Sequence, residues 1–357
     1  MRKIRLIILI VILSITSCKR ELPIESEIAQ PQVSVVLFTP SPSPTQTLEP
    51  TLTPTINPLR TIAPTLTPSP TPDPFNEMYI DSLASRTYGG GVLEDLGSLN
   101  SASPQFSRRL FRYRSEGLNM FGFINIPDGD GPYPVILMLH GYVNPPEYAT
   151  LDYSTRYADA FAEEGYMVLH PNLRGYAPSP AEENSLGIGD TVDTLNLLAL
   201  VRQFSGTEGL LKKADASRIG LWGHSMGGGV VMRILVVDDE IKAALFYASI
   251  HADEKINLAH FKEDGRGNKK ILAPDTALDQ ISPLAYLNLV DTPMSIHHGD
   301  ADTVVPSEWS DFLCGYLEDL GKNVDCTTYA GQTHTFQNSG DTQFINNSIS
   351  FFNEKLK

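Results

Sequence analysis

The sequence predicts an α/β fold, in which helices cover both faces of a mostly parallel β-sheet. From residue 135 onward, short apolar runs alternate with longer stretches of helical periodicity, the order typical of such a sheet. Runs such as 135–139 (Val-Ile-Leu-Met-Leu) are apolar at every position, so we expect strands with both faces buried. Residues 218–237 point the same way, because a glycine-flanked turn separates two apolar runs there.

Each expected element follows from its own stretch of sequence. Strand-like runs on both sides of Glu116 and Gly117 predict a hairpin over residues 108–125. Residues 75–105 are mixed, and residues 250–291 are expected to be a polar, irregular insertion. The other expected strands are 135–139, 166–169, 243–248, 293–298 and 324–329. The expected helices are 152–164, 188–204, 307–320 and 341–356. Residues 218–237 are expected to form one further strand followed by one further helix.

The first residues have the features of a targeting segment. A basic start at residues 1–5 precedes an apolar run over 6–13 that is too short to cross a bilayer, which predicts a signal peptide over residues 1–17. Residues 15–18 (Ile-Thr-Ser-Cys) resemble the lipobox of bacterial lipoproteins. That resemblance implies that Cys18 is lipidated and anchors the protein to a membrane on the extracytoplasmic face of the cell envelope. Ordinary secretion, with Cys18 incidental, is the alternative.

Residues 18–74 are expected to form a disordered spacer. Twelve prolines occur between residues 31 and 74, interleaved with serine and threonine. Such a composition cannot bury a core and favours an extended, semi-rigid chain. The spacer would hold a single folded domain, residues 75–357, away from the membrane.

Charge and cysteine content narrow the partners and the compartment. Five of the 27 basic residues lie among the first twenty, where no acid occurs, so the remainder carries 22 basic and 42 acidic residues. A surface this acidic repels nucleic acid and anionic membranes, and we expect neither to bind the folded domain. Cys314 and Cys326 lie in an expected helix and the strand after it, and a disulfide between them fits an oxidising compartment. Two buried thiols are the alternative.

Ser225 is the candidate nucleophile. It lies in Gly223-His224-Ser225-Met226-Gly227, which matches G-x-S-x-G, the nucleophile elbow. The glycines remove side chains that would clash in a tight strand-to-helix turn. The helix that follows directs its free N–H groups to the place where an oxyanion would form. A plain strand–turn–helix joint is the alternative, so the partners of Ser225 must decide.

Two candidate partners of Ser225 follow later strands. Asp302 comes after the strand ending at His298, and His334 comes after the strand ending at residue 329. Active groups gather at the carboxyl ends of strands in parallel sheets. The order Ser225, Asp302, His334 is the order expected for α/β-hydrolases. Asp300 is the alternative acid. The spacing between the acid and Val305-Pro306 favours Asp302, which leaves Asp300 as a loop-stabilising residue.

These motifs give the chain a family resemblance. The elbow, residues 298–306 (H-G-D-A-D-T-V-V-P) and residues 331–336 (G-Q-T-H-T-F) are similar to the catalytic domain of prolyl-oligopeptidase-type serine peptidases, which include dipeptidyl aminopeptidases and acylaminoacyl peptidases. The resemblance covers residues 108–357 and implies an α/β-hydrolase fold. It also implies that the backbone N–H groups of Met226 and Tyr142 form the oxyanion hole. Large members carry an N-terminal β-propeller, and no blade repeat occurs in this sequence.

Other polar residues are interpreted as structural. His224 is expected to pack rather than react, and Arg174 to brace loops near the site. The pair His297-His298 could suggest a metal site, but adjacent strand residues point to opposite faces, so one ion could not easily bind both. We therefore expect no metal and no cofactor.

The sequence thus predicts an exported, lipid-anchored serine hydrolase that acts through an acyl-enzyme on a small peptide or ester substrate. The resemblance favours a serine-type peptidase. Because the dipeptidyl peptidases hold a free amino terminus with a glutamate pair in the part missing here, carboxylesterase activity is a strong alternative. A third interpretation is an inactive hydrolase fold that serves as a surface binding module.

Overall fold

The computed structural model describes residues 73–262 and 273–357. The chain divides into two units, Met1–Pro68 and Ser69–Lys357, and only the second contains described residues. The predicted signal peptide, Cys18 and all of the spacer but residues 73 and 74 lie outside the described residues, so these assignments stay predictions. Within the described part, no helix is both long and apolar enough to cross a membrane.

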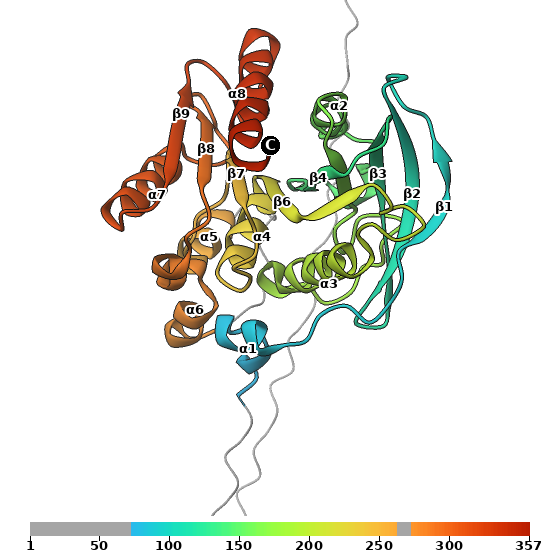
Figure 1. Cartoon of the computed structure of the whole chain (residues 1–357). Helices are drawn as coiled ribbons and strands as arrows, with labels where there is room; N and C mark the ends of the chain where they lie inside the picture. The colour runs from blue at the N-terminus through green and yellow to red at the C-terminus, as the bar shows by residue number, and fades with distance from the viewer. Residues whose placement is uncertain (1–72, 263–272) are drawn as a thin grey trace, which may run out of the picture. The chain divides into compact units, whose positions relative to one another are not determined.

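A nine-stranded mixed sheet forms the centre of the described unit (Figure 1). Its strands lie in the order β1-β2-β3-β5-β4-β6-β7-β8-β9. The first three pair antiparallel with their neighbours, whereas β5 through β9 run parallel. The strands are β1 (Glu94–Leu99), β2 (Phe106–Ser115), β3 (Leu118–Pro127), β4 (Tyr133–Leu139), β5 (Met167–Pro171), β6 (Ala214–His224), β7 (Ala243–Tyr247), β8 (Met294–Gly299) and β9 (Val324–Tyr329).

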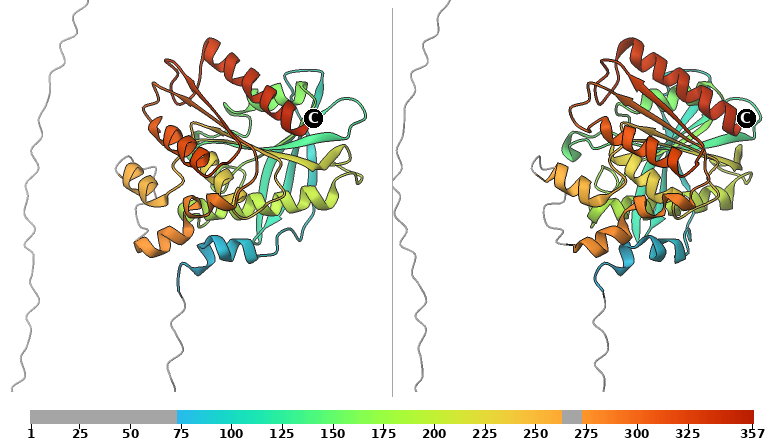
Figure 2. Two further views of the ribbon diagram at one scale, coloured as in Figure 1. Left: turned by 60° about the vertical axis from the view of Figure 1, so that its left-hand side comes forward. Right: turned by 90° about the vertical axis from the view of Figure 1, so that its left-hand side faces the viewer.

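Helices cover both faces of this sheet, which confirms the predicted α/β class (Figures 1 and 2). Strand β4 shows why the apolar run at 135–139 is continuous. Val135, Leu137 and Leu139 join a core with residues of α3, α4 and α7, whereas Ile136 and Met138 join a second core with residues of α2 and α8. The helices are α2 (Thr155–Glu163), α3 (Ile188–Phe204), α4 (Met226–Leu235), α7 (Glu308–Asp319) and α8 (Asn338–Leu356).

The expectation of an irregular insertion at 250–291 is wrong in part. The insertion contains α5 (Glu254–Phe261), α6 (Asp275–Ile281) and a 3₁₀ helix (Pro283–Leu289). Helix α5 begins with a cap, because the side chain of Asp253 accepts a hydrogen bond from the Lys255 amide at 2.8 Å. These helices are short and bury few apolar residues, so their periodicity is weak.

The mixed stretch 75–105 also contains regular structure. Helix α1 (Ile80–Ser85) buries Leu83 in a small cluster with Ile188, Val192 and Ile281. Strand β1 is a sheet edge whose pairing with β2 includes an ion pair between Asp95 and Arg109. Charged side chains are a usual feature of edge strands, and they conceal the alternation that marks a half-buried strand.

Cys314 on α7 and Cys326 on β9 form a disulfide, as their positions in the sequence predict. They are twelve residues apart in sequence. We expect the double variant Cys314→Ser/Cys326→Ser to lose about 3 kcal/mol of unfolding free energy, because the cross-link restricts the unfolded chain. Denaturant unfolding with and without a reducing agent measures this loss. If reduction left the midpoint of the wild-type protein unchanged, the disulfide would not contribute to its stability.

Candidate active site

Ser225 lies at a sharp turn between β6 and α4. Its backbone has φ 53° and ψ −117°, a conformation rare for any residue but glycine. The flanking glycines make this turn possible, since a Cβ on Gly223 would lie 2.6 Å from the carbonyl oxygen of Gly227. The Ser225 amide donates to the carbonyl oxygen of Tyr247 at 2.9 Å, which ties the turn to the end of β7. The elbow expected from the motif is therefore present, with Ser225 at its apex.

Asp302 and His334 meet at the carboxyl edge of β8 and β9. His334 Nδ1 donates to Asp302 Oδ2 at 2.7 Å. The other carboxylate oxygen, Oδ1, accepts from the amides of Val304 at 2.7 Å and Val305 at 3.0 Å. The Asp302 side chain is fully buried. Asp300 instead accepts from the Gly331 amide at 2.6 Å, which is the loop-stabilising role expected of it.

The charge of Asp302 is protected despite its burial. Burial raises the pKa of this carboxyl, but hydrogen bonds from His298 and His334 and from the backbone amide of Val305 lower it by more. The net pKa lies well below the usual range for an aspartate. Asp302 is therefore a carboxylate throughout the neutral range, and it can orient a histidine ring and stabilise its cation.

Ser225 and His334 line one pocket of about 290 Å³. Because Nδ1 of His334 is bonded to Asp302, Nε2 is the ring nitrogen left to accept a proton from a nucleophile. The rest of the lining is largely apolar and comes from Tyr142, Met226, Ile250, Phe261 and Val304. A nucleophile, a base and an apolar cavity are thus combined in one place, the arrangement expected of an acyl-transfer site.

Both predicted oxyanion donors border this pocket. Met226 begins α4, and the first amides of an α-helix have no acceptor within the helix. Tyr142 lies three residues beyond β4, and the carbonyl oxygen of Leu139 in β4 packs directly against Gly227. The end of β4 and the start of α4 are therefore in close contact. This contact brings the Tyr142 and Met226 segments to the pocket that Ser225 lines.

Comparison with known protein families places this chain in one of them. The model of the dienelactone hydrolase family matches residues 120–351, well over half of the chain. The chain belongs to the dienelactone hydrolase family. The predicted α/β-hydrolase fold is thereby confirmed, and the described residues include no propeller.

Two curated relatives of this family member are named as peptidases. The chain is 26% identical over 239 residues to the uncharacterized peptidase YuxL of Bacillus subtilis, covering 63% of this chain and 35% of YuxL. It is 25% identical over 242 residues to the uncharacterized peptidase YtmA of the same organism, covering 66% of this chain and 89% of YtmA. The chain therefore spans about a third of the first relative and most of the second.

Solved structures share the fold. An acylaminoacyl peptidase of Pyrococcus horikoshii matches with a TM-score of 0.60 and 25% identity, covering 72% of this chain and 42% of that one. Acetyl xylan esterase 1 of a Thermoanaerobacterium species matches with a TM-score of 0.58 and 15% identity, covering 81% of this chain and 95% of that one. The likeness to peptidases is thus borne out, and esterases have the same architecture.

His298 contacts the acid of the site, although its sequence context suggests only a metal ligand. Its Nε2 lies 3.0 Å from Asp302 Oδ2, and its Nδ1 lies 2.6 Å from Ser310 Oγ. His297 has different partners, Ser295 Oγ at 2.8 Å and the Tyr329 hydroxyl at 2.9 Å. Among the described residues no three His, Cys, Asp or Glu side chains form a metal-binding group. The short separation of His298 and Asp302, four residues, was the sequence feature that could have indicated their contact.

Arg174 is buried and braces the chain, as expected, but away from the pocket. Its guanidinium bonds the Asp193 carboxylate at 2.8 and 3.0 Å and Glu116 at 3.1 Å, and it donates to the carbonyl oxygen of Glu183 at 2.9 Å. Glu116 lies at the β2–β3 turn and Asp193 on α3. Arg174 therefore ties this turn to α3, and these partners do not line the Ser225 pocket.

Asp190, beside this brace, predicts a pH effect on stability. Burial raises its pKa from 3.8 to about 7, although Asn184 and the Arg174 amide donate to its carboxylate. The folded state thus holds this proton more tightly than the unfolded state. The stabilising contribution is complete below about pH 4 and is lost as the pH rises through about 7. We expect Asp190→Asn to remove this decrease in unfolding free energy between pH 5 and pH 8, measured by denaturant unfolding at the two pH values. A variant whose unfolding free energy fell between these pH values as much as that of the wild type would contradict the prediction.

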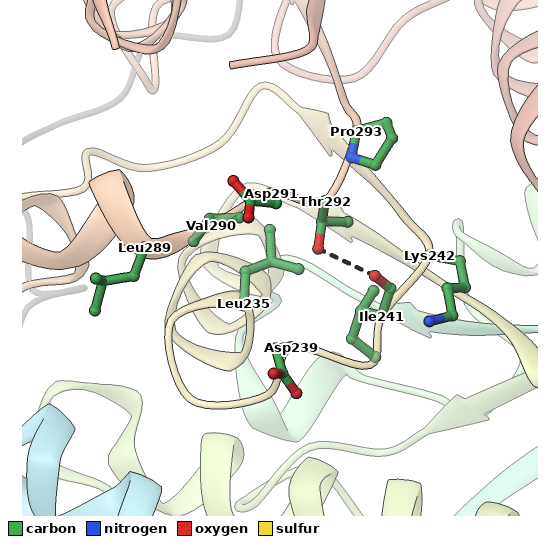
Figure 3. A pocket seen from close by; sticks show the side chains of 9 residues that line it. All are labelled: Leu235, Asp239, Ile241, Lys242, Leu289, Val290, Asp291, Thr292 and Pro293. Carbon is green, nitrogen blue, oxygen red and sulfur yellow. Dashed lines mark hydrogen bonds between the residues drawn. The ribbon is translucent and has the colours of Figure 1, made fainter. Parts of the chain in front are cut away.

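A second hollow, of about 390 Å³, lies at the opposite end of β7 and β8 (Figure 3). It is lined by the end of α4 and by the loops that lead into these two strands, where Thr292 Oγ1 donates to the carbonyl oxygen of Ile241 at 3.0 Å. Its charged side chains are Asp239, Lys242 and Asp291. None of its lining residues is a serine, cysteine or histidine, so this hollow lacks the serine and histidine pair that the Ser225 pocket contains.

Proposed function

We propose that the protein is an extracytoplasmic serine hydrolase that cleaves a peptide, amide or ester bond through an acyl-enzyme. The observation that carries the proposal is the 2.7 Å bond from His334 to the buried Asp302, on the rim of the pocket that contains Ser225. Membership of a hydrolase family and relatives named as peptidases support it.

In the proposed reaction Ser225 Oγ attacks the substrate carbonyl carbon while His334 Nε2 accepts the hydroxyl proton. Asp302 holds the ring in the tautomer that leaves Nε2 free, and it stabilises the imidazolium that forms. The N–H groups of Met226 and Tyr142 bind the developing oxyanion. His334 then donates its proton to the leaving amine or alcohol, leaving an acyl group on Ser225. A water molecule then attacks the acyl carbon while His334 takes its proton, and His334 returns that proton to Ser225 Oγ as the acid leaves.

Two substrate classes remain, and different observations favour them. The peptidase relative YtmA, of which the chain spans 89%, favours peptides or aminoacyl amides. The pocket favours an ester with a small acyl group, since 290 Å³ is near the lower limit of small-molecule sites and its walls are apolar. We place the peptidase first and the carboxylesterase second.

The location is part of the proposal. The basic start, the apolar run and the lipobox-like residues before Cys18 support export and anchoring by an N-terminal lipid. Membrane contact would then be confined to this anchor. The proline-rich spacer would give the hydrolase domain reach toward small substrates outside the membrane.

A fluorophosphonate probe tests the serine chemistry. Such probes react only with an activated serine, so the folded protein should be labelled at Ser225 and nowhere else. An unlabelled protein would favour the binding-module alternative. The substrate class is tested by turnover of p-nitrophenyl esters against aminoacyl and dipeptidyl p-nitroanilides. Anilide turnover at rates comparable to esters would exclude the esterase assignment, and ester turnover alone would exclude the peptidase.

A further inference from the structure

We propose that Tyr153 and His224 form a hydrogen-bonded brace that holds the oxyanion-side loop and the general-base loop in fixed positions around Ser225. This inference rests on the proposed serine hydrolase function. The brace is defined here as Gly141 N–H, the Tyr153 hydroxyl, the His224 ring and the His334 carbonyl oxygen. Its two side chains are positioning residues, because they act on the reacting groups through other residues.

The three bonds of the brace run in a single direction. The Gly141 amide donates to the Tyr153 hydroxyl at 2.8 Å, and an amide can only donate. The hydroxyl lies 2.8 Å from His224 Nδ1. His224 Nε2 lies 2.9 Å from the carbonyl oxygen of His334, which can only accept. Because Nε2 must donate to this carbonyl, a neutral His224 has no proton on Nδ1, and Nδ1 accepts the proton of the Tyr153 hydroxyl.

Each bond ends at or beside a residue of the proposed mechanism. Gly141 precedes the oxyanion donor Tyr142, His224 precedes the nucleophile Ser225, and His334 is the base itself. The residues are closely packed at this point, and no side chain fits at Gly141. A Cβ there would lie 2.9 Å from both His224 Nδ1 and the Tyr153 hydroxyl, and 3.0 Å from Ser225 Cβ. Loops separated by tens of residues in sequence are thereby held to one another.

The surroundings keep the brace in this protonation state. His224 is 2% exposed, and its ring lies against the rings of Tyr247 and His334, with centroid distances of 4.3 and 4.7 Å. Burial above all, and then His334, lower the pKa of His224 well below its usual value, although the His334 carbonyl and Asp302 oppose this shift and Arg156 adds to it. Burial likewise raises the pKa of Tyr153. A neutral His224 adds no positive charge beside His334 when His334 takes the serine proton.

Four variants separate positioning from mere folding. Tyr153→Phe removes both hydroxyl bonds, and His224→Leu removes the acceptor and the donor. His224→Gln keeps one acceptor and one donor on a single carbon, as in an imidazole, and so can remake both bonds. Tyr166→Phe is the matched control, since it also removes one tyrosine hydroxyl. That hydroxyl donates to Asn353 Oδ1 at 2.8 Å, and neither residue lines the Ser225 pocket.

We expect Tyr153→Phe and His224→Leu to lower kcat for a p-nitrophenyl ester by about ten- to hundredfold, with KM changed less than about threefold, because small misplacements of reacting groups cost this much. His224→Gln should recover most of the loss, and Tyr166→Phe should leave kcat unchanged. Equal losses in His224→Gln and His224→Leu, or an unchanged kcat in a folded Tyr153→Phe protein, would overturn the brace.

A measurement on the unmodified protein needs no turnover. Nitrogen-15 NMR of the histidine rings should show His224 neutral and protonated at Nε2 from pH 6 to pH 9. Protonation at Nδ1, or titration within that range, would overturn the brace even if every variant failed to fold. A wild-type protein that neither turned over substrates nor reacted with a fluorophosphonate would instead overturn the proposed function, and the NMR result would still decide whether the brace exists.

Discussion

Replacing Ser225 by alanine is expected to lower kcat for the best ester or anilide substrate by about 10⁶-fold, to the residual rate that other site groups support. The reason is geometric as well as chemical. The elbow holds the side chain at its apex, where both His334 and the Met226 amide border the pocket. No other hydroxyl can take its place without a change in the backbone of the turn. Steady-state kinetics with active-site titration of the wild-type protein measure the loss.

Ser249→Ala is the matched control for this change. Ser249 is also buried, lies two residues beyond the end of β7, and donates to the carbonyl oxygen of Ile250 at 3.1 Å. Its removal deletes one serine hydroxyl from the same neighbourhood, and we expect kcat to change less than about threefold. A Ser225→Ala protein with more than a hundredth of wild-type activity would show that another group is the nucleophile, and an equal loss in Ser249→Ala would point to a general disturbance of the fold.

The central sheet could be predicted because its sequence signal is local. Strands buried on both faces must be apolar at nearly every position, so β4 at 133–139 and β7 at 243–247 stand out from their surroundings. The helix expected at 188–204 is α3 with the same bounds. The elbow was visible for the same reason, because its glycines are required within two residues of the serine.

Elements whose stability comes from distant contacts were missed. Helix α6 is seven residues long and is held by packing of Ile281 against α1 and α3, which no local pattern records. Strand β1 depends on its pairing with β2. Short elements of this kind gain little from their own propensity, so tertiary contacts decide whether they form.

The same distinction holds within the candidate site. Ser225, Asp302 and His334 follow strands and lie in motifs, so their sequence positions predicted their meeting place. Tyr153 has no motif, and its partners Gly141 and His224 are 12 and 71 residues away in sequence. His224 was expected only to pack. The packing is present, but its two polar bonds appear only when the loops are placed in space.

The second large effect is expected from Asp302→Asn, which should lower kcat by about 10⁴-fold while the protein stays folded. Each oxygen of Asp302 accepts hydrogen bonds: Oδ1 from the Val304 and Val305 amides, and Oδ2 from His298 and His334. An asparagine must turn its NH₂ group toward one of these two sets of donors. If its oxygen takes the backbone amides, the NH₂ faces His334 Nδ1 and favours the tautomer protonated on Nε2. That tautomer cannot accept the serine proton.

Asp300→Asn is the control, because it makes the same chemical change two residues away. Asp300 accepts from the Gly331 amide, and an asparagine oxygen can accept that bond equally well. We therefore expect kcat to change less than about threefold, measured on the same substrate at the same pH as for Asp302→Asn. Comparable losses in the two variants would mean that the loop, and not the carboxylate bonded to His334, sets the rate. A folded Asp302→Asn protein within tenfold of wild type would show that His334 keeps its tautomer without this charge, and the acid would have to be reassigned.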